Sequence, residues 1–227
     1  MHEHPLDNPI WNGLTGPHSH LGVGDGKVRR YRADVAMFVA VEDPADPDMP
    51  GLAALIGEGN AGFVTSSPVS LPGGIEVVRI ADVLQMVVAD WRPVPVDLPM
   101  VPLGDRDEPA MVELVDLTKP GPFAPRARLM GAFRGLFDEG RLIAMSGERM
   151  RTQDFTEISA VCTHPDYRGR GYAKQFVSQG GNEIIAAGKT PFLHVFADNQ
   201  LAIATYEKLG FIRSRMMQFT VIRRAAR

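Results

Sequence analysis

The stretch from Glu157 to Lys174 reads EISAVCTHPDYRGRGYAK and runs from a predicted strand through a turn into a predicted helix. Its first seven residues favour a strand, and apolar residues recur at helical spacing after Gly171. The turn RGRGYA (168–173) supplies two guanidinium groups and glycines that let a backbone approach a ligand. A helix N-terminus also offers free amides and the positive end of the helix dipole, which suit a pyrophosphate. On these six residues alone, a basic helix-start loop without a ligand is an equal alternative.

Outward from this stretch, the second half of the chain reads as alternating strands and helices. We expect a hairpin of strands at 133–137 and 141–150, later strands at 192–196 and 211–222, and a helix at 201–209. Residues 111–118 (MVELVDLT) are predicted as a strand, and 122–133 as a short helical region. Gly180 and Gly181 interrupt the helix after Gly171, which indicates close packing there.

Prolines at 93, 95, 99, 102 and 109 place a predicted boundary near residues 100–110. Residues 1–100 are expected to form an accessory module, α/β or mostly β, with strands at 35–41, 75–80 and 83–88. Residues 110–227 are expected to form the catalytic domain.

Composition excludes several classes of protein. The chain is 44% apolar and has one cysteine, so an internal disulfide and a cysteine-rich zinc site are excluded. Neither a signal peptide nor a membrane span is indicated, and we expect a cytoplasmic protein without a membrane partner.

Charge is distributed unequally along the chain. Sixteen acidic and 7 basic side chains precede residue 111, whereas 11 acidic and 17 basic side chains follow it. The basic half suits an anionic ligand and the acidic half argues against nucleic acid, although unequal solvated faces are the plainer explanation. His2-Glu3-His4 and His18-Ser19-His20 lack a third partner at helical spacing, so no metal site is predicted.

The turn Arg168 to Ala173 satisfies a known signature: Gln or Arg, two residues, Gly, one residue, then Gly or Ala. In its strand–turn–helix setting, the chain resembles the GNAT superfamily of acyl-CoA-dependent N-acetyltransferases. A second family feature follows as Asn199, Tyr206 and Leu209-Gly210-Phe211. With TKPGPF (118–123), residues 111–227 are most similar to a bacterial branch related to glycine N-acyltransferases. The resemblance implies an α+β fold with a mixed, mostly antiparallel sheet that is flanked by helices and splayed between the EISAVCT and FLHVF strands. The first hundred residues would then be a candidate degenerate GNAT-like half or an interaction module.

The resemblance also implies a cofactor site for acetyl-CoA, with no metal. The strand residues Val161, Cys162 and Thr163 would bind the pantetheine arm, and Asn199 would steady that arm or the adjacent helix start. The pyrophosphate would bind the backbone amides of the turn, which is formed by Arg168, Gly169, Arg170, Gly171, Tyr172, Ala173 and Lys174.

Two residues are candidates for catalysis. Tyr206 lies where many family members place a phenol that protonates the departing thiolate, although a packed core tyrosine is the alternative. Glu157 is the candidate base, and the alternatives are an exposed carboxylate, an ion pair with Arg149, or a water relay that takes the proton instead. Strand alternation places Val161 on the face of Glu157 and turns Cys162 away from it.

These observations predict direct transfer of an acetyl or short acyl group from CoA to a primary amine. The acceptor is expected to be a small-molecule amine or amino acid rather than a protein N-terminus, and the protein a monomer or homodimer. A non-catalytic acyl-CoA-binding sensor or interaction protein is the alternative function.

Overall fold

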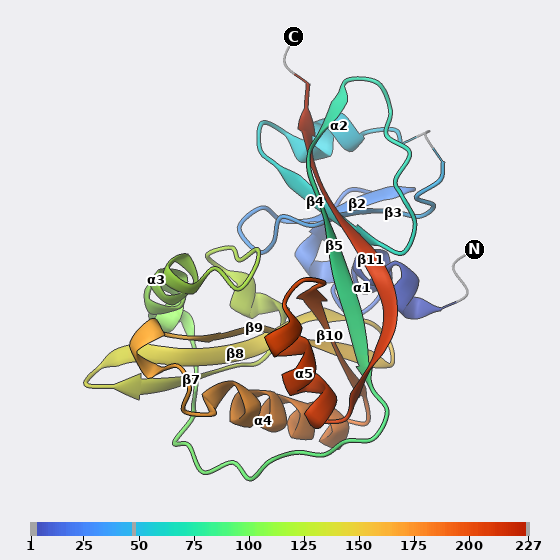
Figure 1. The fold of residues 1–227 in the computed structure, drawn as a ribbon. Helices are drawn as coiled ribbons and strands as arrows, with labels where there is room; N and C mark the ends of the chain where they lie inside the picture. Colours follow the sequence, from blue (N-terminus) through green and yellow to red (C-terminus); the bar gives the residue numbers. More distant parts are fainter. Residues whose placement is uncertain (1–3, 47–48, 226–227) are drawn as a thin grey trace.

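The computed structural model describes residues 4–46 and 49–225, and within them the chain forms one eight-stranded sheet and one three-stranded sheet (Figure 1). The large sheet has the order β4-β11-β5-β10-β9-β8-β7-β6 and the small one the order β1-β2-β3. The strands are β1 (Gly22–Val23), β2 (Val28–Tyr31), β3 (Val39–Val41), β4 (Ala61–Thr65), β5 (Ile75–Val88), β6 (Val101–Pro102), β7 (Phe133–Asp138), β8 (Arg141–Arg151), β9 (Phe155–Thr163), β10 (Thr190–Phe196) and β11 (Phe211–Arg224).

Helices flank this sheet. The α-helices are α1 (Pro9–Leu14), α2 (Leu52–Ile56), α3 (Glu108–Thr118), α4 (Tyr172–Ala186) and α5 (Gln200–Lys208). Short 3-10 turns lie at η1 (Pro5–Asp7), η2 (Ser19–Leu21), η3 (Asp105–Asp107), η4 (Ala127–Met130) and η5 (Pro165–Tyr167). None of the helices in the described residues is both long and apolar enough to cross a lipid bilayer.

The pairing in the large sheet is antiparallel except between β9 and β10. This arrangement confirms the mixed, mostly antiparallel sheet that was predicted. The long strands β5 and β11 run side by side across the molecule, and β5 also pairs with β10 (Figure 1). The sheet therefore joins residues before and after the predicted boundary at 100–110, and the division into two domains stays a prediction.

The strands β9 and β10 separate soon after they meet. Their parallel pairing covers Thr190–Phe192 opposite Phe155–Glu157, and beyond these residues the two strands diverge. This is the predicted splay between the EISAVCT and FLHVF strands, and it opens the sheet at its centre.

The helices α3 and α4 cover opposite faces of β7, β8 and β9 (Figure 1). The prediction of a strand at 111–118 was wrong, because this segment is part of α3. Its buried residues Met111, Leu114 and Val115 follow the spacing of one helix face. On the other face, Phe176 of α4 packs against Leu136 and Ile143.

Two predicted strands of the first half also need correction. Residues 75–80 and 83–88 form one continuous strand, since Ala81 and Asp82 both pair with β11. The strand predicted at 35–41 is shorter and begins at Val39, because the amide of Val35 instead closes a turn onto Arg32.

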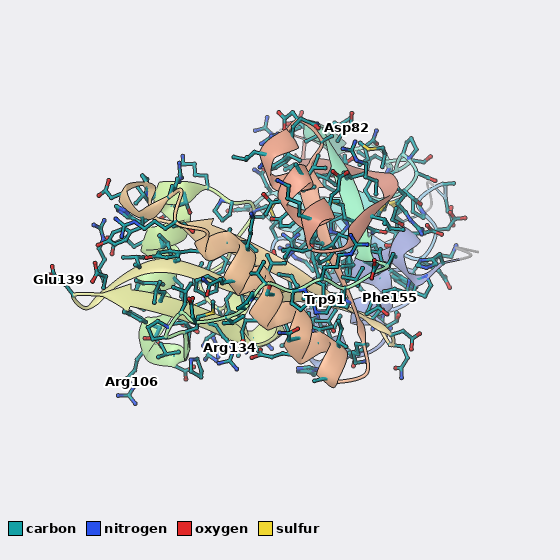
Figure 2. The ribbon with its side chains drawn as sticks, turned by 60° about the horizontal axis from the view of Figure 1, so that its bottom comes forward. Asp82, Trp91, Arg106, Arg134, Glu139 and Phe155 are labelled. Carbon is teal, nitrogen blue, oxygen red and sulfur yellow. The ribbon has the colours of Figure 1, made fainter. Side chains whose placement is uncertain are left out.

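The proline-rich segment after β5 runs along α4, and Figure 2 shows Trp91 beside that helix. The Trp91 indole donates to Asn182 Oδ1 at 2.9 Å, and a Cβ at Gly181 would lie 2.3 Å from the Trp91 ring. This contact confirms the predicted close packing at Gly181. A Cβ at the preceding residue, Gly180, would make only ordinary van der Waals contacts.

Candidate active site

A cavity of about 450 Å³ lies where β9 and β10 diverge. Its walls come from β9 (Ile158 to Thr163), β10 (His194 to Phe196), the residues 118–122 and the first turns of α4 and α5. Seven of the predicted site residues line it, namely Val161, Cys162, Thr163, Arg168, Ala173, Asn199 and Tyr206. Glu157, Gly169, Arg170, Gly171, Tyr172 and Lys174 do not line it.

The turn that leads into α4 adopts the backbone that its glycines permit. Gly169 and Gly171 have φ angles of 79° and 78°, a left-handed conformation that disfavours other residues. A Cβ at Gly171 would meet nothing within 4 Å, so the backbone there faces open space. Within the described residues no side chain caps this helix start. The first amides of α4 are therefore available to an anion.

The arginines of this turn hold it in place. Arg168 Nε donates to the carbonyl of Thr163 at 3.3 Å, which ties the turn to the end of β9. Arg170 Nη2 donates to the carbonyl of Asp166 at 3.4 Å, and its guanidinium lies 4.8 Å from the Tyr167 ring centroid. Both side chains keep positive charge beside the free amides.

The start of α5 supplies the opposite wall of the cavity. Asn199 Oδ1 accepts a hydrogen bond from the amide of Ala202 at 3.1 Å, so Asn199 caps this helix. Tyr206, on the second turn of α5, is half-buried, and burial raises its pKa to about 12. The phenol is therefore neutral at neutral pH and can donate a proton.

A bulge interrupts β9 inside the cavity. Ala160 has a φ of 51°, and the pairing with β8 shifts between Ser159 and Cys162. A bulge leaves the backbone of the extra residue unpaired with the neighbouring strand. A non-glycine residue in the left-handed region costs about 1–3 kcal/mol, and such strain often marks a functional site.

The bulge also overturns the predicted alternation along β9. Ile158 and Val161 both pack toward α4, whereas Ala160 and Cys162 both pack toward α3. The extra residue reverses the faces, so the prediction that Cys162 is turned away from the Glu157 side was wrong. Cys162 is buried against α3, and burial raises the pKa of its thiol to about 11. A thiol with this pKa is a poor nucleophile at neutral pH.

Glu157 lies below this bulge with its side chain fully buried. Its carboxylate accepts Arg149 Nε at 2.8 Å, Arg149 Nη2 at 2.6 Å and the Met150 amide at 3.2 Å. Burial acts to raise the pKa of Glu157, but the Arg149 ion pair and the His194 hydrogen bond hold it well below its ordinary range. The structure therefore contains the ion pair with Arg149 that was one of the alternatives for this residue.

His194 completes this buried cluster. Its Nδ1 lies 2.8 Å from Glu157 Oε1, and its Nε2 lies 3.1 Å from Gln85 Nε2. The Gln85 amide group also donates to the carbonyl of Leu6 at 2.9 Å, so this atom is the amide nitrogen. Because Gln85 is a donor, His194 Nε2 accepts and the proton is on Nδ1, which donates to Glu157. Both nitrogens of the imidazole are therefore engaged.

The sequence did not reveal the part of the site that comes from the first half of the chain. Phe38, Val64 and Val83 line the cavity although they lie far before the glycine turn. No local motif marks them, since each is an apolar residue of a buried segment that the sheet brings to the site. The loop 118–122 was noted only as part of the resemblance.

The histidines near the N-terminus do not form a metal site within the described residues. His18 bonds to the Tyr31 hydroxyl at 2.9 Å, and no group of three potential ligands occurs among the residues that the structure describes. His2 and Glu3 lie outside the described residues.

Comparison with known proteins identifies the family. A crystal structure assigned to the GNAT family of acetyltransferases, from Novosphingobium aromaticivorans, superposes with a TM-score of 0.91 at 40% sequence identity. The match covers 99% of this chain and 100% of that one. The chain belongs to the GNAT family of acetyltransferases. The model of the FR47-like protein family also matches residues 133–220, which include both splayed strands and the glycine turn of this acetyltransferase.

Curated relatives match a shorter segment of this acetyltransferase. A mycothiol acetyltransferase of Corynebacterium efficiens is 34% identical over 77 residues, which are 34% of this chain and 26% of that protein. An acetyltransferase of Yersinia pestis is 44% identical over 50 residues, 21% of this chain and 35% of the relative. This chain thus spans about a third or less of the curated relatives it matches. A GCN5-related N-acetyltransferase-like protein from Streptococcus suis shares the fold, with a TM-score of 0.59 at 18% identity over 96% of this chain and 92% of that one.

Proposed function

We propose that this acetyltransferase binds acetyl-CoA where β9 and β10 diverge and transfers the acetyl group to a primary amine. One observation carries the proposal: a single cavity is lined by Arg168 and Ala173 at the two ends of the glycine turn, by both diverging strands and by Tyr206. Such a transfer needs these three parts, because the cofactor must be anchored and aligned and the departing CoA thiolate must be protonated.

The residues present fit a phosphorylated, extended cofactor. The amides of residues 169–174 would hold the pyrophosphate at the start of α4, with Arg168 and Arg170 beside them. The pantetheine arm would extend along β9 at Val161, Cys162 and Thr163. At these residues β9 still pairs with β8 on one edge but no longer pairs with β10 on the other. Asn199 would hold the start of α5 beside the arm, because its side chain caps that helix.

Acetyl-CoA supplies the acetyl group in activated form, as a thioester. The amine loses one proton on forming the amide, and the sulfur takes up one proton when the carbon–sulfur bond breaks. Tyr206 would donate the proton to sulfur, because its phenol is neutral at neutral pH and lies on the cavity wall. The free backbone at the Ala160 bulge would bind the thioester carbonyl oxygen as it gains charge.

Glu157 stays a candidate for the proton acceptor, but its contacts favour another role. Its carboxylate is engaged by Arg149, His194 and the Met150 amide, and it does not line the cavity. A carboxylate with a strongly lowered pKa is also a weak base. We therefore propose that water takes the proton from the amine and that Glu157 is a positioning residue for Arg149, which does line the cavity.

The test combines binding with turnover. Calorimetric titration with CoA should give binding, and incubation of acetyl-CoA with a panel of small amines and amino acids should release thiol only when an amine is present. Binding should also stabilise the protein against heat. If CoA at millimolar concentration gives neither a heat of binding nor thermal stabilisation, the proposal is overturned.

A further inference from the structure

A second cavity, of about 280 Å³, adjoins the first. The two cavities share the five residues Phe38, Pro122, Arg149, Ser159 and Ala160. They therefore meet at the β9 bulge, where the thioester is proposed to lie.

The walls of this second cavity are mostly apolar, and apart from the five shared residues they come from parts of the chain that do not line the first cavity. They include the segment 33–38, the loop 122–127 and the residues Met130 and Phe133. Among the side chains that line it, Val35, Met37, Phe38, Phe123, Met130 and Phe133 provide most of the apolar surface.

The two charged side chains in the wall are already paired. Arg149 forms its two-point contact with Glu157. Glu148 accepts Arg151 Nε at 3.0 Å, and its side chain is 12% exposed. Among the described residues that line this cavity, no ionised side chain is left to balance a charge on the body of a bound molecule. Burying such a charge without a partner is costly.

We propose, on the basis of the proposed function, that this second cavity binds the acceptor and that the acceptor is a primary amine with an uncharged, largely apolar body. The amine would lie at Ser159 and Ala160, where the cavities meet, and the apolar body would pack against Phe38, Phe123 and Met130. The volume is at the small end for ligand pockets, so the body is compact, as in an arylalkyl or short alkyl amine.

Matched amines test this proposal directly. Phenethylamine and phenylalanine differ by one carboxylate, and hexylamine and 1,6-diaminohexane differ by one further ammonium group. We expect kcat/KM for the member of each pair with the uncharged body to be higher by about tenfold or more. CoA binding is measured in parallel on the same protein.

A variant locates the site. Ala124 lines the second cavity and not the first, so Ala124→Phe should lower kcat/KM for phenethylamine by about tenfold or more and leave CoA affinity unchanged. Ala186→Phe, at an exposed position near the end of α4, is the matched control and should change neither. Thermal denaturation of both variants checks that they fold.

The outcomes separate this inference from the proposed function. Absence of CoA binding overturns the proposed function. If CoA binds but the carboxylate-bearing or doubly charged amines are the better substrates, or none of the four is acetylated, the proposal for the acceptor is overturned while the cofactor site stands. It is also overturned if Ala124→Phe, folded and CoA-binding, acetylates phenethylamine as the wild type does.

Discussion

The guanidinium of Arg149 and the carboxylate of Glu157 form a two-point ion pair, with Nε–Oε2 and Nη2–Oε1 distances of 2.8 and 2.6 Å. The Glu157 side chain has no exposed surface and that of Arg149 is 16% exposed, so both charges depend on each other for compensation. The pair joins β8 to β9 just before the sheet opens. Because Arg149 lines both cavities, loss of the ion pair would affect the stability of the fold and also the shape of these cavities.

Glu157→Gln should therefore destabilise the protein. The substitution leaves the Arg149 charge buried without its partner, which costs about 3–5 kcal/mol in free energy of unfolding. Urea denaturation measures the loss. The double variant Arg149→Met, Glu157→Gln removes both charges and should recover at least half of it. A Glu157→Gln protein as stable as the wild type, with a pH–rate profile that has lost its acidic limb, would instead support Glu157 as the base.

Gly171→Val should weaken CoA binding at the start of α4. The φ of 78° and the open space beside Gly171 let the backbone approach a phosphate, and a branched side chain would occupy that space. Calorimetric titration should show a fall in CoA affinity of about tenfold or more.

Gly188→Val is the matched control for this turn. Gly188 has a φ of 73° and also meets nothing within 4 Å, but it follows the far end of α4. It carries the same backbone strain without facing the cofactor, so its CoA affinity should equal that of the wild type. Equal losses in both variants would mean that strain, and not a phosphate site, explains the effect at Gly171.

His18 should make the protein less stable as the pH falls from about 6.5 to 4. Its side chain is buried, and burial, aided by the nearby Arg151, lowers its pKa to about 4. Above pH 6.5 the imidazole is neutral in both states. Below it the unfolded chain binds a proton that the folded chain does not, so up to about 3 kcal/mol of stability is lost by pH 4.

Urea denaturation across this pH range tests the role of His18. His18→Gln can still bond to the Tyr31 hydroxyl but does not titrate, so its stability should vary less between pH 6.5 and 4. His20→Gln, two residues away and exposed, should reduce the slope much less, because His20 contributes least among the causes of the low pKa of His18. An unchanged slope in His18→Gln would assign the pH dependence to other groups.

The glycine turn and the helices on either side of the cavity could be predicted because their signals are local. Glycine at 169 and 171 indicates a turn that needs backbone conformations other residues disfavour. The apolar positions of α4 and α5 repeat at helical spacing. Segment 111–118 shows the limit of this approach. Its apolar residues are dense enough to read as a strand, and only their packing against β8 and β9 identifies the helix.

Other features of the site depend on the whole sheet and have no local signal. Val83 reaches the cavity because β5 lies between β10 and β11, and Phe38 because it bridges to Gly62 of β4 in the same sheet. The bulge at Ala160 has no signal in the sequence, because an alanine side chain does not favour a left-handed backbone and the extra residue is evident only from the pairing of β9 with β8. The two-residue alternation that was applied to β9 fails at this point.

Tyr206→Phe tests the proposed chemistry most directly. The variant keeps the ring, which lies 6.0 Å from the Phe211 ring between centroids, so packing and CoA affinity should change little. It deletes the proton that the phenol would donate to the departing sulfur. We expect kcat to fall by about 10²–10⁴ at nearly constant CoA affinity, measured by thiol release and calorimetry. A phenol with a pKa of about 12 also predicts that wild-type kcat stays high into the alkaline range, because the proton is lost only near that pH. Full activity in Tyr206→Phe would assign the proton to solvent and leave Tyr206 as a packed residue of the cavity wall.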